Sequence, residues 1–382
     1  MIIRKNIFEW LVAILIYLSI PPSFMWHIDA REGVLFLCVL LLSIFYSLFS
    51  RLKIQIDNLK FAIFLSIIFF YIALKDDSSI FGLINKTLLP YILVVNSAFS
   101  IAVINKFIKI YSILLIPSIV VYFLVVLLGI PLPYDVLDAV NTTKDYSYTQ
   151  YPFLVTIDDP LNIGYYRFMS WFDEPGVVGS VSGILLMVKG LEFNKWETYV
   201  LLFSGFLSLS MAFFVILFVY IFLFQNNKVK LVAAVIFCTL IIICYSNDII
   251  SYLLLDRFNF ENGTFAGMNR TSDKMDLFMK DFLRSDRIWF GYGHNYSQTV
   301  VNAGGASFKD LIVNYGLIPF IGLLLSTILY AVSKLKLSKE LIVYIFMWLA
   351  IIYQRPFITL LFYFFLLYFP LYILEGKKNS SE

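Results

Sequence analysis

The fold of this chain is decided by residues 198–224, TYVLLFSGFLSLSMAFFVILFVYIFLF, a stretch of 27 residues without a charged side chain. As one helix the stretch would be about 40 Å long, whereas the hydrocarbon core of a bilayer is about 30 Å thick. A single helix would therefore need a strong tilt to cross. The alternative is two shorter helices joined by a hairpin turn at Ser208–Met211.

Basic residues favour the hairpin, because short loops rich in Lys and Arg stay in the cytoplasm. With the hairpin, 16 of the 29 Lys and Arg residues lie on the cytoplasmic side and four lie in short outer loops. The other nine fall in two long loops, where the rule is weak. A single span would instead place Lys228, Lys230 and the C-terminal tail outside. We therefore predict the hairpin, with both termini in the cytoplasm.

The rest of the chain is equally apolar. Its 382 residues are 60% hydrophobic and only 14% charged, and the mean hydropathy is +0.83. A soluble domain usually carries about 25% charged residues. We predict an all-α, polytopic integral membrane protein whose residues 1–382 form a single membrane domain with about 12 transmembrane helices. The predicted spans are 8–26, 33–50, 61–75, 83–104, 110–129, 177–190, 196–209, 211–225, 231–247, 308–332, 340–354 and 357–374.

The predicted topology leaves two long loops facing outward, residues 130–176 and 248–307. The first loop ends in YYRFMSWFDEPG, where aromatic rings stand beside carboxylates. Flat rings stack on the C–H faces of sugars, and carboxylates accept hydrogen bonds from sugar hydroxyls. This pattern favours a glycan-binding site, and the alternative is an aromatic belt at the membrane surface. The predicted glycan contacts are Tyr165, Tyr166 and Trp171.

The same stretch holds three charged candidates. Arg167 lies near the bilayer surface, where an unpaired cation is costly, so we expect it to face a carboxylate, a cavity or an anionic ligand. Asp173 and Glu174 precede Pro175, which places them at the entrance of a helix. They are candidate catalytic carboxylates, and the alternative is that one of them simply caps the helix.

The second loop contains NRTSDKMDLFMKDFLRSDRIWFGYGHN, residues 269–295. Its apolar residues recur with helical spacing and predict an amphipathic helix. These residues are Met275, Phe278, Met279, Phe282 and Leu283. Arg270 stands just ahead of the helix, and a helix N-terminus beside an arginine favours binding of an anion.

The loop then reaches GYGHN, a glycine-hinged turn at residues 291–295. His294 is one of only two histidines in the chain, and it is a candidate proton acceptor because histidine titrates near neutral pH. The alternative is a structural histidine. Tyr292, beside it, is a further candidate contact for a glycan.

Several motifs that would indicate other chemistry are absent from the sequence. It has no Asp-x-Asp pair for a metal-bound nucleotide sugar, no GxxxxGK[ST] loop and no His/Cys ligand set. We therefore expect no metal and no cofactor, and neither ATP hydrolysis nor a soluble nucleotide donor. We also expect no nucleic-acid partner.

Taken in order along nearly the whole chain, these motifs resemble those of the O-antigen polymerases of the Wzy type. The matching segments are RFMSWFDEPG at 167–176, LSLSM at 207–211, NRTSDKM at 269–275, GYGHN at 291–295, SFKDLIVNYGLIPFIG at 307–322 and QRP at 354–356. Each pattern is degenerate by itself, and their order and spacing carry the resemblance. The more distant O-antigen ligases share the membrane fold.

The resemblance implies a metal-independent glycosyltransferase of the bacterial inner membrane. Such an enzyme transfers a glycan from undecaprenyl pyrophosphate to a second lipid-linked repeat unit in the periplasmic leaflet. Its partners would be the lipid-linked donor and acceptor, membrane lipid and a chain-length regulator protein. Arg167, Arg270 and Arg355 would hold the pyrophosphate, and Glu174, Asp173 or His294 would activate the acceptor hydroxyl.

Two departures from the family pattern bear on the alternatives. Met211 follows the second serine of the hairpin, where many relatives carry an arginine. Ser307 and Phe308 stand where ligases typically have a His-Asn pair, which favours polymerase over ligase. A flippase or transporter is a second alternative, but transporters usually place polar residues within their spans. A binding or structural membrane protein would leave the paired carboxylates and arginines unexplained.

Overall fold

The computed structural model is mostly helical and forms two compact units. The first unit comprises Met1–Ile20, Ile28–Phe107 and Arg270–Glu382, and the second comprises Pro21–His27 and Ile108–Asn269. The structure describes residues 2–20, 32–50, 55–94, 97–137, 147–158, 163–231, 233–235, 260–261, 264–265, 273–294, 296 and 307–381. The predicted span at 231–247 lies largely outside these described residues.

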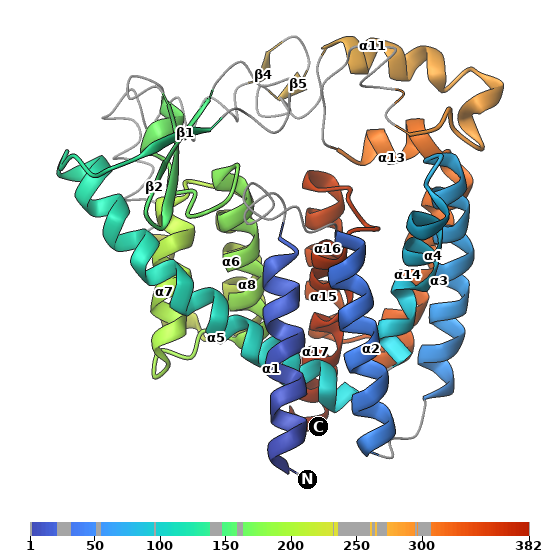
Figure 1. The fold of residues 1–382 in the computed structure, drawn as a ribbon, viewed down its shortest axis with the longest axis horizontal. Coiled ribbons are helices and arrows are strands. Elements are labelled where there is room, and N and C mark those ends of the chain that lie inside the picture. The colour runs from blue at the N-terminus through green and yellow to red at the C-terminus, as the bar shows by residue number, and fades with distance from the viewer. Residues whose placement is uncertain are drawn as a thin grey trace. The chain divides into compact units, whose positions relative to one another are not determined.

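The first unit is built from helices. In chain order these are α1 (Ile2–Leu18), α2 (Glu32–Ser50), α3 (Ile56–Lys75), α4 (Ile80–Leu88), the 3-10 helix η2 (Leu89–Val94), the first part of α5 (Ser97–Tyr122), α11 (Asp273–Phe282), η8 (Asp286–Ile288), α13 (Phe308–Tyr315), α14 (Leu317–Leu335), α15 (Lys339–Gln354), α16 (Leu361–Tyr368) and α17 (Pro370–Ser381). Every residue of α16 is buried, as expected for a helix that is apolar all round. This helix contacts α1, α15 and α17 and forms the centre of the unit (Figure 1).

The second unit combines helices with a small sheet. Its elements are the rest of α5, the π-helical turn η3 (Phe123–Leu127), β1 (Asp135–Leu137), β2 (Tyr148–Tyr151), β3 (Leu154–Ile157), η4 (Ile163–Tyr166), α6 (Pro175–Lys189), α7 (Trp196–Leu207), α8 (Met211–Phe224), β4 (Phe260–Glu261) and β5 (Thr264–Phe265). The strands β1, β2 and β3 pair in that order and are antiparallel. The sheet lies in the first long loop, which the sequence did not predict to contain strands.

Three helices of the described chain are long and apolar enough to cross a membrane: Ile56–Lys75, Ser97–Leu127 and Leu317–Leu335. Four further apolar helices are shorter: Gly33–Leu48, Ile80–Val94, Pro175–Lys189 and Met211–Phe224. The count of about 12 spans stays a prediction.

The predicted hairpin at residues 208–211 is confirmed. Helix α7 ends at Leu207 and α8 begins at Met211, and Leu209 between them has a φ of +47°. The predicted break between spans at 105–109 is wrong, because α5 runs through it without interruption. Lys106 can lie within this helix because its ammonium group pairs with the carboxylate of Glu9 in α1.

Two other predicted spans are each divided in the structure. The span at 308–332 is broken at Gly316, whose φ of +91° ends α13 before α14 begins. The span at 357–374 is interrupted at Phe369 and Pro370, where α17 starts. Pro370 has no N–H to donate into the preceding turn, and proline is readily accommodated at the start of a helix.

Candidate functional site

The candidate site lies in the first unit, where the GYGHN turn meets the ends of two helices. The backbone N–H groups of Tyr292 and Gly293 donate to the carbonyls of Val313 and Asn314 in α13, over 2.9 Å each. The N–H of His294 then donates to the carbonyl of Lys75, the last residue of α3, over 3.2 Å. These bonds fix the backbone of the histidine.

Two glycines allow this close approach. Gly291 has a φ of +65°, and a Cβ atom there would come within 2.4 Å of the carbonyl oxygen of Asn314. A Cβ atom at Gly316 would come within 2.2 Å of the carbonyl oxygen of Trp289. Side chains cannot occupy such positions without a shift of backbone. Gly291 of GYGHN, a weak motif by sequence, thus has a specific role in this approach.

The side chain of His294 contacts a carboxylate. Its Nδ1 atom lies 3.0 Å from Oδ1 of Asp76, the residue that follows α3. Asp76 has a buried side chain, 4% exposed, whereas the imidazole is 49% exposed. An ionised carboxylate only accepts hydrogen bonds, so Nδ1 is the donor, and in the neutral imidazole Nε2 is then an acceptor.

Two further side chains donate to the same carboxylate. The hydroxyl of Tyr315, at the end of α13, donates to Oδ1 of Asp76 over 2.7 Å. The ammonium group of Lys86, on α4, pairs with Oδ2 and also donates to the hydroxyl of Ser78 over 3.1 Å. The Asp76 carboxylate therefore has three partners that come from three separate segments of the chain.

These contacts set the protonation state of the carboxylate. Burial raises the pKa of Asp76, but the hydrogen bonds from His294, Lys86 and Tyr315 outweigh it and hold the pKa below its ordinary value. Burial, and then the charge and hydrogen bond of Asp76, raise the pKa of Tyr315 well above its ordinary range. At neutral pH the pair is a carboxylate anion and a neutral phenol.

The arrangement can accept a proton from a group that reaches the exposed imidazole. A histidine held by a carboxylate through Nδ1 presents Nε2 as a general base, and the carboxylate stabilises the imidazolium that forms. Sequence analysis had identified His294 by its rarity but missed Asp76, Lys86 and Tyr315. The run DDSS at 76–79, directly after an apolar helix, was the available signal.

The charged candidates of the first long loop lie in the second unit. Arg167 donates from Nε to the carbonyl of Ser208 over 3.1 Å and from Nη2 to the carbonyl of Leu209 over 3.3 Å. Glu174 occupies the N-cap position of α6, but its side chain makes no capping hydrogen bond. The carbonyl of Asp173 accepts a hydrogen bond from the hydroxyl of Tyr148 over 3.1 Å.

The predicted glycan contacts of that loop form two ring pairs. Tyr165 and Tyr166 meet edge to face with 5.5 Å between ring centroids, and Tyr166 is exposed. Trp171 meets the exposed ring of Phe153 edge to face, also at 5.5 Å. Burial first, and then the neighbouring Tyr165, raise the pKa of Tyr151 on β2 to about 12. These rings offer flat apolar surface beside the phenol of Tyr151, which stays protonated at neutral pH.

The remaining predicted residues lie in the first unit or outside the described chain. Tyr292 stacks on Tyr296 with 4.2 Å between centroids and packs against the cluster of Met275 and Phe282, so it helps to hold α11. Arg355 directly follows α15 and is buried, 6% exposed. Arg270 lies outside the residues that the structure describes.

The predicted amphipathic helix of the second loop is confirmed as α11. Met275 and Phe282 are fully buried, and Phe278 and Met279 pack against them. The exception is Leu283, which lies just beyond the end of the helix and is 51% exposed.

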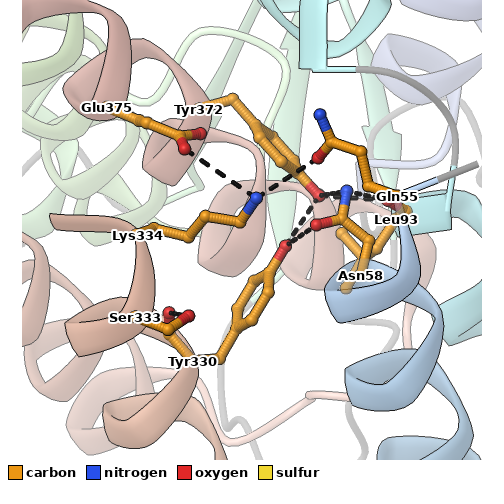
Figure 2. A network of polar contacts seen from close by, with 8 residues as sticks. All are labelled: Gln55, Asn58, Leu93, Tyr330, Ser333, Lys334, Tyr372 and Glu375. Atoms are coloured by element: carbon orange, nitrogen blue, oxygen red, sulfur yellow. Dashed lines mark hydrogen bonds and ion pairs between the residues drawn. The ribbon is translucent and has the colours of Figure 1, made fainter. Parts of the chain in front are cut away.

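A second polar network lies inside the first unit, between α3, α14 and α17 (Figure 2). Asn58 accepts from the hydroxyl of Tyr330 over 2.8 Å and donates to the carbonyl of Leu93 over 3.1 Å. The hydroxyl of Tyr372 donates to the same carbonyl over 3.0 Å. All of these groups are buried and bonded to one another, so this network serves to join helices.

Comparison of the chain with known protein families, with curated proteins and with solved structures gives no match.

Proposed function

We propose that this protein is a membrane glycosyltransferase that polymerises lipid-linked oligosaccharide repeat units into a surface polysaccharide. It crosses the inner membrane about twelve times, with both termini in the cytoplasm. It transfers a growing glycan from undecaprenyl pyrophosphate to the hydroxyl of a second lipid-linked unit on the periplasmic side, without a metal ion. The order of the sequence motifs supports this proposal.

The single observation that carries an enzymatic role is the contact between the half-exposed imidazole of His294 and the buried carboxylate of Asp76. In the proposed step the acceptor oxygen bonds to the anomeric carbon as the bond from that carbon to the pyrophosphate breaks. Nε2 of His294 takes the proton of the acceptor hydroxyl, and the pyrophosphate leaves with the electron pair. Asp76 stabilises the imidazolium.

The pyrophosphate needs cations more than a proton donor, because it leaves as a stable anion. Arg270 and Arg355, both of the first unit, are the proposed ligands. Glu174, at the N-terminal end of α6, is the alternative base.

Deletion of the gene tests the function. The surface polysaccharide of the deletion strain, separated on a gel, should lose its ladder of chain lengths and keep a single-repeat product. Lipid-linked polymer that accumulates without transfer would instead identify a ligase. Loss of both the polymer and the single-repeat product would identify a flippase.

Two variants then separate the candidate bases at matched expression. His294→Ala should abolish chain extension, whereas Glu174→Gln should retain it if the histidine is the base. The matched control is alanine at the other histidine, His27→Ala, which should polymerise normally. Loss confined to Glu174→Gln would transfer the role to the carboxylate, and normal polymerisation by both variants would exclude both residues as the base.

A further inference from the structure

We propose that Lys86 is a positioning residue that neutralises the Asp76 carboxylate, so that Asp76 orients His294 without holding its imidazole in the protonated, positively charged form at neutral pH. The value of this for catalysis rests on the proposed function, since only a neutral imidazole can accept a proton. The electrostatic claim itself concerns the protein alone.

The two oxygens of the Asp76 carboxylate bond to different partners. Oδ1 of Asp76 accepts from Nδ1 of His294 and from the hydroxyl of Tyr315. Oδ2 pairs with the ammonium group of Lys86. Because the lysine uses the other oxygen, it supplies a full positive charge without displacing the histidine. One oxygen of Asp76 thus accepts the bond that orients the imidazole, and the other oxygen pairs with the ammonium group that compensates the charge.

Burial makes this compensation matter. The side chains of Asp76 and Lys86 are 4% and 23% exposed, so water screens their interaction only in part. A buried carboxylate left uncompensated beside an imidazole strongly favours the imidazolium, because opposite charges within about 4–6 Å stabilise each other. Such a histidine would already carry the proton that it is proposed to accept.

The other charged and titratable groups at the site do not replace this lysine. From the end of α3, the ammonium group of Lys75 points to the carbonyl of Gly291 at 3.4 Å, and Asp77 is exposed. From α13, Tyr315 donates as a neutral phenol, and Asp310 adds a negative charge. Lys86 of α4 is therefore the cation that these contacts assign to the carboxylate.

The test measures the protonation of His294 directly. Diethyl pyrocarbonate modifies unprotonated imidazole, and its reaction with the purified full-length protein in detergent can be followed as a function of pH. Trypsin releases His294 in the peptide Ile288–Lys309, which contains no other histidine, so mass spectrometry reports this residue alone. No substrate or polymerase activity is needed.

Lys86→Gln is the informative variant, because glutamine can still donate to Asp76 but carries no charge. We expect the pH midpoint of His294 modification to rise in Lys86→Gln. Lys86→Arg keeps the charge and should restore the wild-type midpoint. Lys280→Met, which removes an exposed lysine of α11, is the control and should leave the midpoint unchanged.

An unchanged midpoint in folded Lys86→Gln would overturn the proposal and leave Lys86 with a packing role. So would an equal rise in Lys86→Arg, because the charge would then not be the cause. A shifted midpoint in a protein that does not polymerise glycans would support the electrostatic role and refute the proposed function, so the two failures are distinguishable.

Discussion

The Nε atom of Arg167 lies 3.1 Å from the carbonyl oxygen of Ser208, and this bond joins two of the sequence motifs, RFMSWFDEPG and LSLSM. The carbonyl stands at the C-terminal end of α7, where the last carbonyls of a helix have no partner within the helix. The guanidinium also reaches the carbonyl of Leu209. Arg167 therefore closes the hairpin turn between α7 and α8.

Replacing Arg167 with alanine should lower the free energy of unfolding by about 2 kcal/mol, because hydrogen bonds from a charged group to two carbonyls are lost. The free energy of unfolding of Arg167→Lys should lie between those of the wild type and Arg167→Ala, since an ammonium group cannot reproduce the fork of a guanidinium. Thermal melting of the purified variants in detergent measures this order. Arg284→Ala, at an exposed arginine, is the control and should change stability by less than about 0.5 kcal/mol. A wild-type melting temperature for Arg167→Ala, with chain extension lost, would assign the side chain to a ligand instead.

Gly291→Ala should displace His294 and abolish chain extension, because the added Cβ atom meets the backbone of Asn314. Gly129→Ala is a matched control. Gly129 has a nearly identical φ of +64°, but a Cβ atom there would have no neighbour within 4 Å. Both variants share the left-handed strain of about 1–2 kcal/mol, and only Gly291→Ala adds a clash. Equal polymer lengths from the two variants would contradict the role of the glycine.

Tyr330→Phe should lower the free energy of unfolding by about 1–3 kcal/mol, because it deprives the buried amide oxygen of Asn58 of its donor. Tyr353→Phe serves as control, since Tyr353 is 40% exposed and should cost less than about 0.5 kcal/mol. Thermal melting of both variants under the same conditions makes the comparison. If the two melt alike, the network of Figure 2 contributes little to stability.

Acidification should destabilise the protein in part through Asp76. Its pKa is lower in the folded than in the unfolded chain, so its contribution is fully present above the ordinary value of 3.8 and is lost as the pH falls through the folded pKa. Asp76→Asn should therefore melt below the wild type at neutral pH and show a flatter decline below about pH 4. Melting curves recorded from neutral pH down to about pH 3 test this. Parallel curves for the two proteins would show that Asp76 does not titrate differently on unfolding.

The proposed topology of twelve spans predicts that Lys228 lies inside and that the two long loops lie outside. In a chain without native cysteines, an impermeant thiol reagent applied to intact cells should label Lys144→Cys and Asn262→Cys but not Lys228→Cys. Disruption of the cells should then expose position 228 to the reagent. Labelling of position 228 in intact cells would refute this orientation of the hairpin.

Local patterns predicted some elements well. The hairpin at 208–211 and the apolar face of α11 follow from charge distribution and helical spacing, which short stretches of sequence contain. The helix through Lys106 could not be predicted, because its partner Glu9 lies 97 residues away. A lysine within an apolar run predicts a loop, unless the carboxylate that pairs with it in the folded protein is known.

The sequence predicted only part of the candidate site, for the same reason. His294 could be singled out because histidine is rare in this chain, but Asp76 was one of many carboxylates. Its importance comes from burial and from donors that are distant in sequence, and neither property appears in composition or periodicity. Tyr315 was likewise assigned to a span, and only the break at Gly316 places its hydroxyl on the carboxylate.

The residues that contact the Asp76 carboxylate are synthesised in a fixed order. Lys86 follows Asp76 after ten residues, whereas Tyr315 follows it only after 239. A ribosome that adds about 5–20 residues per second needs roughly 10–50 seconds to cover the longer interval. For most of that time the nascent chain holds the carboxylate and its lysine but neither the histidine nor the tyrosine. The chain therefore cannot form the contact between His294 and Asp76 until the second long loop has been translated, and any product truncated before that loop lacks this contact.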